Sequence, residues 1–190
     1  MSSEKPVLVA YRPEWPERAA LLVSVLGVAL GGLADRIDHI GSTAIPQMSA
    51  KDVLDLQVSV SNLKAAAPSF DAPLAALGFE RSPYEADHVP AGRVDDPDNW
   101  AKRLWLRRGH RDGDVNLHLR RTGSPNARLA LLFRDWFRAH PEAVPSYSAF
   151  KLTLAGIAPD TGTYSDVKDP VVDLVIAVAE AWAAKVGWAP

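Results

Sequence analysis

Apolar residues recur at helical spacing near the start of the chain. This stripe predicts a helix that opens near Pro13 or Pro16 and buries one face. The stripe consists of Leu22, Val25, Leu26, Ala29 and Leu33. A short extended stretch, 7–10, precedes this helix, and a short strand, 37–40, follows it.

The middle of the chain alternates apolar and other residues as strands do. Leucine or valine stands at every second position of 53–60, which predicts a strand with one apolar face. Two further strands are predicted over 103–107 and 115–120, joined by a turn. Between the strands over 53–60 and 103–107, the sequence predicts a helix over 62–77, a short strand over 79–84 and an acidic loop or flap over 85–99.

The pattern becomes helical after residue 123. Ser124 followed by Pro125 has the residue types of an N-cap and a first helical position, and a second helix is predicted around 146–155. The last helix is predicted to begin at Asp169 and Pro170. Its expected buried residues are Val171, Leu174, Val175, Val178 and Trp182. This order predicts an α/β (α+β) fold, in which a mixed, partly antiparallel sheet precedes a helical half.

The composition fits one globular domain. Of 190 residues, 47% are hydrophobic and 23% are charged, so the chain can bury a core without cross-links. We expect a single domain over 1–190, sheet-rich over about 7–121 and helical over about 124–188.

Cysteine content and net charge exclude several kinds of site. The chain has no cysteine, so disulfides, thiolate metal sites and a cysteine nucleophile are excluded. The formal net charge of −2 gives no general attraction to nucleic acid or to anionic membranes. Any anion site must therefore be a local cluster of bases.

The N-terminal region predicts a soluble, cytoplasmic protein. The segment Met1–Pro6 lacks the apolar stretch of a signal peptide. The apolar segment 19–33 is interrupted by three glycines and is expected to fall short of a membrane span.

Each predicted strand carries a row of polar or charged side chains on one face. In 103–107, Leu104 and Leu106 are expected to face inward, which turns Arg103, Trp105 and Arg107 outward. In 115–120, the polar row is Asn116, His118 and Arg120. If the strands are neighbours, one surface gathers Asp55, Gln57, Asn116, His118, Arg103 and Arg107. The alternative is a solvated face of an antiparallel sheet.

A turn of Gly41, Ser42 and Thr43 favours a ligand site over a solvated face. Glycine lets the backbone approach a ligand closely, and exposed amides with hydroxyl groups hold phosphate oxygens. The turn stands about a dozen residues before Asp55 in the sequence.

Several motifs occur in an order that resembles the GrpB family. The first blocks are Tyr11-Arg12-Pro13-Glu14-Trp15, then His39-Ile40-Gly41-Ser42-Thr43-Ala44-Ile45-Pro46 with Ala50-Lys51 and Asp55-Leu56. The later blocks are Asn116-Leu117-His118-Leu119, Phe133-Arg134-Asp135, and the pairs Tyr147 with Lys151 and Tyr164 with Lys168. Together these blocks cover nearly the whole chain.

This resemblance implies a nucleotidyltransferase-like fold, in which a Gly-Ser turn precedes a strand bearing metal-binding carboxylates. GrpB-like domains are also fused to dephospho-CoA kinase in some bacteria, which implies nucleotide or CoA-type ligands. The implied partner is a small phosphorylated metabolite or nucleotide. No basic stripe for sequence-specific nucleic-acid binding occurs, and no membrane partner is expected.

The sequence departs from the transferase pattern at the metal site. Nucleotidyl transfer needs two or three carboxylates for Mg²⁺, but the residue two positions after Asp55 is Gln57, and Asp52 falls on the opposite side or in the preceding loop. The metal ligands expected here are Asp55 and His118, for Mg²⁺ or another divalent metal that accepts imidazole. The same two residues are the catalytic candidates.

The remaining candidates would bind the phosphate or other parts of the ligand. They are Gly41, Ser42, Thr43, Lys51, Gln57, Arg103, Arg107, Asn116, Arg134, Lys151 and Lys168. The alternative for Arg134 is an ion pair with Asp135 or Glu142, and the alternative for Lys151 and Lys168 is a place in solvent beside helices.

Three functions remain open from the sequence. One is a nucleotidyl or related phosphoryl transferase. Another is a non-catalytic binding or assisting domain that has lost the metal carboxylates. The last is different chemistry with His118 as acid, base or ligand, because histidine titrates near neutrality.

Overall fold

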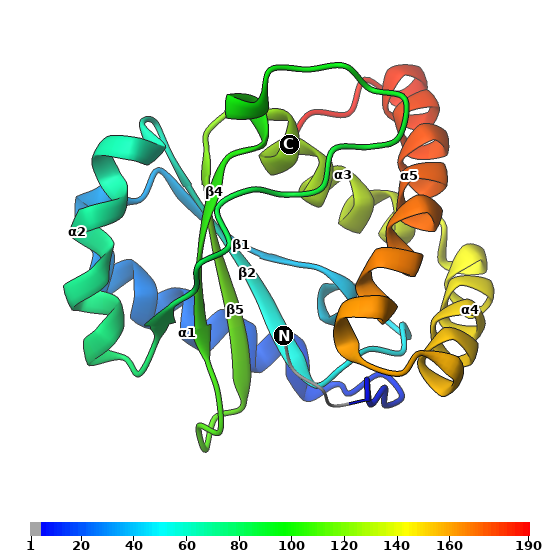
Figure 1. The fold of residues 1–190 in the computed structure, drawn as a ribbon, viewed down its shortest axis with the longest axis horizontal. Coiled ribbons are helices and arrows are strands. Elements are labelled where there is room, and N and C mark those ends of the chain that lie inside the picture. The colour runs from blue at the N-terminus through cyan, green and yellow to red at the C-terminus, as the bar shows by residue number, and fades with distance from the viewer. Residues whose placement is uncertain (1–4) are drawn as a thin grey trace.

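A computed structural model of the chain describes residues 5–190. The expectation for the segment Met1–Pro6 concerns mainly residues outside this range. The fold is built on a five-stranded mixed sheet, and the strands lie in the order β1-β2-β5-β4-β3 (Figure 1). The strands are β1 (Arg36–Ile40), β2 (Val53–Val60), β3 (Glu80–Arg81), β4 (Lys102–Arg107) and β5 (Asp114–Arg121). The central pair, β2 and β5, is parallel, and the other pairs are antiparallel.

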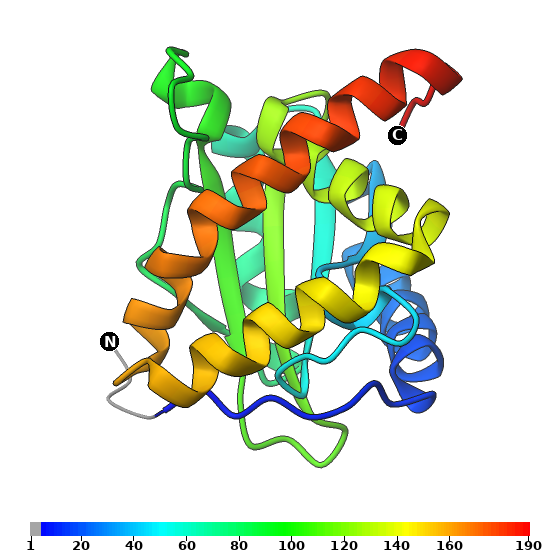
Figure 2. The same ribbon diagram turned by 90° about the vertical axis from the view of Figure 1, so that its right-hand side faces the viewer.

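Helices cover both faces of the sheet. On one face lie α1 (Glu14–Leu30) and α2 (Leu63–Ala76), and on the other lie α3 (Pro125–Ala139), α4 (Val144–Ile157) and α5 (Thr161–Val186). Figure 2 shows α4 and α5 crossing in front of the sheet. Short 3₁₀ turns occupy Gly31–Leu33, Ser42–Ala44, Pro97–Trp100 and Pro141–Ala143. The predicted mixed sheet with flanking helices and a helical C-terminal half is confirmed.

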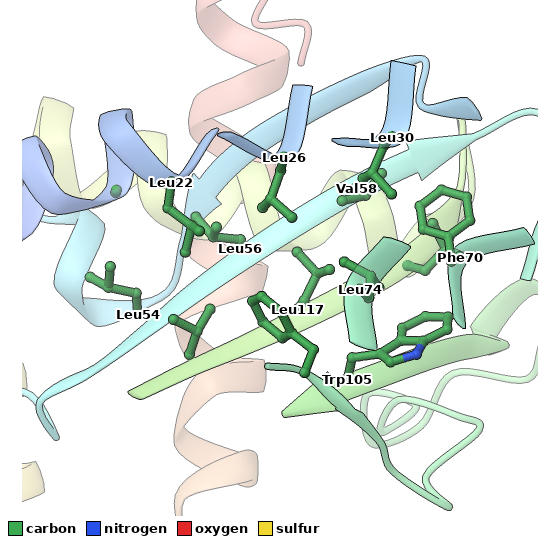
Figure 3. Packing of buried hydrophobic residues seen from close by; sticks show 14 of the residues in the cluster. Leu22, Leu26, Leu30, Leu54, Leu56, Val58, Phe70, Leu74, Trp105 and Leu117 are labelled. Atoms are coloured by element: carbon green, nitrogen blue, oxygen red, sulfur yellow. The ribbon is translucent and has the colours of Figure 1, made fainter. Parts of the chain in front are cut away.

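The main core lies between the sheet and the first two helices. Leu54 and Leu56 of β2 and Leu117 of β5 point toward α1 and are at most 1% exposed (Figure 3). Burying a leucine side chain contributes about 1.5–3 kcal/mol. The apolar row of each central strand therefore anchors this face, and the polar row is turned to the opposite face.

The first helix differs from its prediction in its buried stripe and in its length. Val25 and Leu33 are 46% and 39% exposed, and the buried residues are Trp15, Ala19, Leu22, Leu26 and Leu30. With its 3₁₀ extension the helix runs over Glu14–Leu33, 20 residues, which is long and apolar enough to cross a membrane by length and composition. The expectation that this segment falls short of a membrane span is therefore wrong as to length, although its buried face packs on the sheet.

The last helix begins earlier than the sequence predicted. Its N-cap is Asp160, whose side chain accepts a hydrogen bond from the amide of Thr163 at 2.8 Å, and Pro170 lies inside the helix. Asp169-Pro170 has the residue types of a helix start, but Asp160 supplies the cap of this same helix earlier in the chain. The buried face of this helix also differs from the prediction: Leu174 and Val178 are exposed, whereas Ile176, Ala179 and Ala183 are buried against α3.

Replacing Asp160 with alanine is expected to lower the free energy of unfolding by about 1 kcal/mol, because the first turn of α5 loses its cap. Asp169→Ala is the matched control and is expected to have a smaller effect, because Asp169 lies inside α5 and does not cap it. Urea unfolding of both variants measures the difference. A larger loss for Asp169→Ala would contradict the assignment of the cap.

Candidate functional site

A pocket of about 490 Å³ lies on the polar face of the sheet, opposite the main core. Its floor comes from β2 and β5, its walls from α3, α4 and α5, and its edges from the turn after β1 and the loop before β4. Leu129, Phe133, Val172 and Ile176 form an apolar part of the wall. Pockets of this size and mixed lining are typical of small-molecule sites.

Asp55, Asn116 and His118 form the floor. The register pairs Asp55 with Asn116, and the Asn116 side-chain amide donates a hydrogen bond to Asp55 Oδ1 at 2.7 Å. His118 Nε2 lies 3.6 Å from the same oxygen. Burial raises the pKa of Asp55, but His118, the Asn116 amide and Lys51 outweigh burial and hold that pKa below its usual value. Burial and the charge of Arg120 lower the pKa of His118. At neutral pH the floor therefore presents an ionised carboxylate beside a neutral imidazole.

The turn after β1 is fitted closely against Asp55. Gly41 has φ +69°, and a Cβ atom at this position would lie 2.5 Å from Asp55 Oδ2. His39 Nε2 and Thr43 Oγ1 are 2.9 Å apart, and burial lowers the pKa of His39 to about 4. His39 is therefore neutral at pH 7, and it contacts the turn through Thr43 without lining the pocket.

Three lysines from separate segments meet at this end of the pocket. Lys51 precedes β2 with its ammonium 5.7 Å from the centre of the Tyr164 ring, Lys151 comes from α4, and Lys168 from α5. Lys151 is 2% exposed and donates hydrogen bonds to Ser42 Oγ, at 2.8 Å, and to the Ser49 carbonyl. The predicted residues Gly41, Ser42, Thr43, Lys51, Asn116, Lys151 and Lys168 are thus brought together with Asp55 and His118.

The lysines affect one another through their charges. Burial and the neighbouring charge of Lys168 lower the pKa of Lys151 to about 7. Burial lowers the pKa of Lys51 as well, and Lys168 adds to this effect, although Asp55 opposes it. Such mutual repulsion indicates a site whose charge is not fully balanced by the protein itself.

A second group of charges lies at the other end of the pocket and was not assigned to the site from the sequence. It consists of the charged residues Lys102, Arg120 and Asp87, with the neutral side chain of Asn126 beside them. Lys102 lies opposite Arg120 in the β4–β5 register, and Arg120 continues the polar row of Asn116 and His118. Asp87 comes from the predicted flap over 85–99. No motif or residue spacing in the sequence predicts that it lies beside β5.

Arg103 and Arg107 do not face the pocket, and the prediction that they bind ligand there is wrong in placement. In the register, Trp105 lies opposite Leu117 and is 1% exposed, so the odd-numbered residues of β4 point toward α1 and α2. Arg107 stacks 5.2 Å from the centre of the Phe79 ring, and Arg103 pairs with Glu85 at 3.2 Å. Both faces of β4 carry apolar and charged residues, so alternation alone did not determine its orientation.

Gln57 and Arg134 also lie outside the pocket lining. Gln57 is fully buried; its amide donates to the Ala127 carbonyl at 3.1 Å, and its oxygen accepts from Arg120 at 2.6 Å. Arg134 donates to Asp135 at 2.7 Å and to the His39 carbonyl at 3.0 Å. Gln57 thus holds Arg120, and Arg134 holds the strand before the Gly41 turn. The ion pair of Arg134 with Asp135 is the alternative that the sequence left open.

The donor set does not fit a magnesium site. Among residues 5–190, no group of three or more His, Cys, Asp or Glu side chains is arranged to hold a metal ion. Asp55 is the carboxylate of the floor, and Asp52 is bound instead by Arg12, Trp15 and Arg18. The side-chain oxygen of Asn116 accepts from Arg108 and is therefore engaged elsewhere. No step is assigned to a metal.

The fold and the site define an α/β protein with a lysine-rich pocket between a mixed sheet and its C-terminal helices. The family model described as GrpB protein matches residues 5–177. The chain therefore belongs to the GrpB family.

Two relatives extend this result over almost the whole chain. The dephospho-CoA kinase of Mycolicibacterium paratuberculosis is 38% identical over 201 residues, which covers 96% of this chain and 48% of that protein. The chain thus spans about half the length of this relative. The crystal structure of the conserved protein GrpB from Enterococcus faecalis matches with a TM-score of 0.73 and 21% identity, over 93% of this chain and 99% of that chain.

A partial match is found to Cid1 in complex with its short product ApU. It has a TM-score of 0.46 and 14% identity, and it covers 75% of this chain and 40% of that chain.

Proposed function

We propose that the chain binds a small phosphorylated metabolite or nucleotide in this pocket. The observation that carries the proposal is that Lys51, Lys151 and Lys168 line the same cavity, which has room for a small molecule, and that Lys151 donates to Ser42 of the Gly-Ser turn. A phosphate group placed there offsets the repulsion among the lysines and accepts charge-assisted hydrogen bonds, which are about twice as strong as neutral ones.

The apolar wall suits the rest of such a ligand. Phe133, Val172 and Ile176 lie in the same cavity as the lysines, so a phosphate at one end leaves an organic group against these side chains. A nucleotide or a coenzyme-like molecule has both parts. The likeness to proteins named dephospho-CoA kinase supports this choice among phosphorylated ligands.

Calorimetric titration with inorganic phosphate, ATP and coenzyme A tests the proposal. Lys51→Met and Lys168→Met are each expected to weaken binding about tenfold, equivalent to about 1.4 kcal/mol, because each removes one charged donor. Lys64→Met is the matched control, since Lys64 is exposed on α2 and does not line the pocket. Equal affinities for all three variants, or no binding by the wild-type chain, would refute the proposal.

Nucleotidyl or phosphoryl transfer is a second candidate. Asp55 favours it, because an ionised carboxylate stands beside the Gly41–Ser42 turn at the lysine end. Repeating the ATP titration with Mg²⁺ and Mn²⁺ separates this candidate from a binding domain. A transferase predicts tighter binding with metal and loss of that gain in Asp55→Asn, whereas a binding domain predicts no change with metal.

A further inference from the structure

Asp87 acts as an anion within the second group of pocket charges. Its Oδ2 accepts hydrogen bonds from Arg120 Nε at 2.7 Å and from the Asn126 side-chain amide at 3.0 Å. Its Oδ1 accepts from Lys102 Nζ at 2.7 Å and from Arg120 Nη2 at 3.0 Å. This two-pronged arginine contact, with a lysine and an amide beside it, also suits a phosphate or the carboxylate of a ligand.

The cations of this group lie in the pocket, on rigid elements. Lys102 and Arg120 stand opposite each other on β4 and β5, and their side chains are 12% and 7% exposed. Asp87, in contrast, belongs to the loop between β3 and β4. The basic half of the cluster is therefore fixed by the sheet, and the acidic half is carried by a loop.

The loop crosses from the sheet to α5. Next to Asp87, His88 Nε2 lies 3.0 Å from Asp173 Oδ2, and the amide of Ala91 donates to the same oxygen at 2.9 Å. Figure 1 shows this green loop reaching α5 before it returns toward β4. The backbone of Asp87 is itself held beside β4, because its amide donates to the Trp100 carbonyl at 2.9 Å and Ala86 forms an antiparallel bridge with Ala101. Exchange of the Asp87 carboxylate for another anion therefore needs only its side chain to turn away from Arg120.

The two cationic groups are separated by a distance that a small molecule can span. Asn116 marks the lysine end on β5, and Arg120 lies four residues further along the same strand. At about 3.3 Å per residue the two positions are roughly 13 Å apart.

We propose that Lys102 and Arg120 form a second anion subsite, filled by Asp87 in this structure, and that the ligand carries a second anionic group that replaces Asp87. This inference rests on the proposed function, because the first anionic group binds at the lysine end. Because one anion replaces another, Arg120 never remains unpaired in the buried site, which would be costly. The ligand class is therefore a molecule with two anionic groups at opposite ends.

The test uses α,ω-alkane bisphosphonates of increasing chain length, each paired with the alkane monophosphonate of equal length. In the wild-type chain, one length is expected to bind more tightly than its monophosphonate. Asp87→Ala is expected to increase this preference about tenfold, since the internal competitor is gone. Lys102→Met is expected to abolish the preference for the bisphosphonate, because the second subsite loses one of its two cations. Glu180→Gln is the control, because Glu180 makes a two-pronged pair with Arg128 outside the pocket.

Asp87→Asn is the second variant, in case Asp87→Ala fails to fold. Its amide oxygen still accepts a hydrogen bond from the bases, although the charge is removed. It is also expected to increase the preference for the bisphosphonate. If the folded Asp87 variants weaken both ligand types equally, Asp87 only supports the pocket and the inference is wrong. If monophosphonates bind and respond to Lys51→Met but no bisphosphonate is preferred in any variant, only this inference fails. If neither ligand type binds, the proposed function fails with it.

Discussion

Gly41→Ala is expected to abolish phosphate binding and to lower the free energy of unfolding by roughly 2–5 kcal/mol. Two costs add at this position. The backbone has φ +69°, which side chains other than glycine rarely adopt, and the new Cβ atom would lie 2.5 Å from Asp55 Oδ2. The turn must therefore move away from the strand, and Ser42 moves with it. Calorimetry with phosphate and urea unfolding measure the two effects.

Gly123→Ala separates the effect of backbone strain from the effect of the contact with Asp55. Gly123 has φ +75°, but a Cβ atom added there has no neighbour within 4 Å. This control is therefore expected to lose about 1 kcal/mol from backbone strain alone and to keep its phosphate affinity. Equal losses in the two variants would mean that the contact with Asp55 does not constrain the turn.

Lys151 is expected to make both stability and anion binding depend on pH above 7. Its pKa is lowered to about 7 by burial and by Lys168, whereas the unfolded chain has the ordinary value of 10.5. Between these values the unfolded state binds more protons, so the free energy of unfolding rises with pH, by up to about 1.4 kcal/mol per pH unit. Anion binding has the opposite dependence, because it favours the charged lysine and takes up a proton.

Sulfate is the suitable probe, because its own charge stays constant across this range. Its affinity for the wild-type chain is expected to fall by up to about tenfold per pH unit above pH 7. Lys151→Met is expected to bind sulfate weakly at every pH and to lose most of the rise in stability. Titration in two buffers with different ionisation enthalpies measures the proton uptake directly. A wild-type affinity that is flat from pH 7 to 9 would contradict the assignment.

The strands and most helices could be predicted because their signals are local. Apolar alternation in β2 identified its buried face correctly, and Ser124 with Pro125 marked the start of α3. Predictions failed where two local patterns competed. The Asp169-Pro170 pair resembles a helix start, yet Asp160 caps α5 instead.

The lysine end of the pocket could be predicted from the sequence motifs, whereas the end formed by Arg120 and Asp87 could not. Lys51, Lys151 and Lys168 stand at motif positions, and all three reach the pocket. Arg120 and Asp87 meet only because β5 and a distant loop come together in the fold, 33 residues apart. In β4, Trp105 packs against Phe70 of α2 and is buried on that side of the sheet. Arg103 and Arg107 share its face and therefore point away from the pocket. This orientation depends on α2 and not on the sequence of the strand.

The parallel pairing of β2 with β5 makes the pocket a product of the complete fold. Asp55 and Asn116 are side-chain neighbours on the pocket floor but lie 61 residues apart in the chain. Closing such a long loop precedes any gain from the pairing, so topologies of this kind fold slowly compared with helical bundles. No single helix, strand or hairpin contains both halves of the floor. Recovery of ligand binding during refolding therefore reports when the central sheet has assembled.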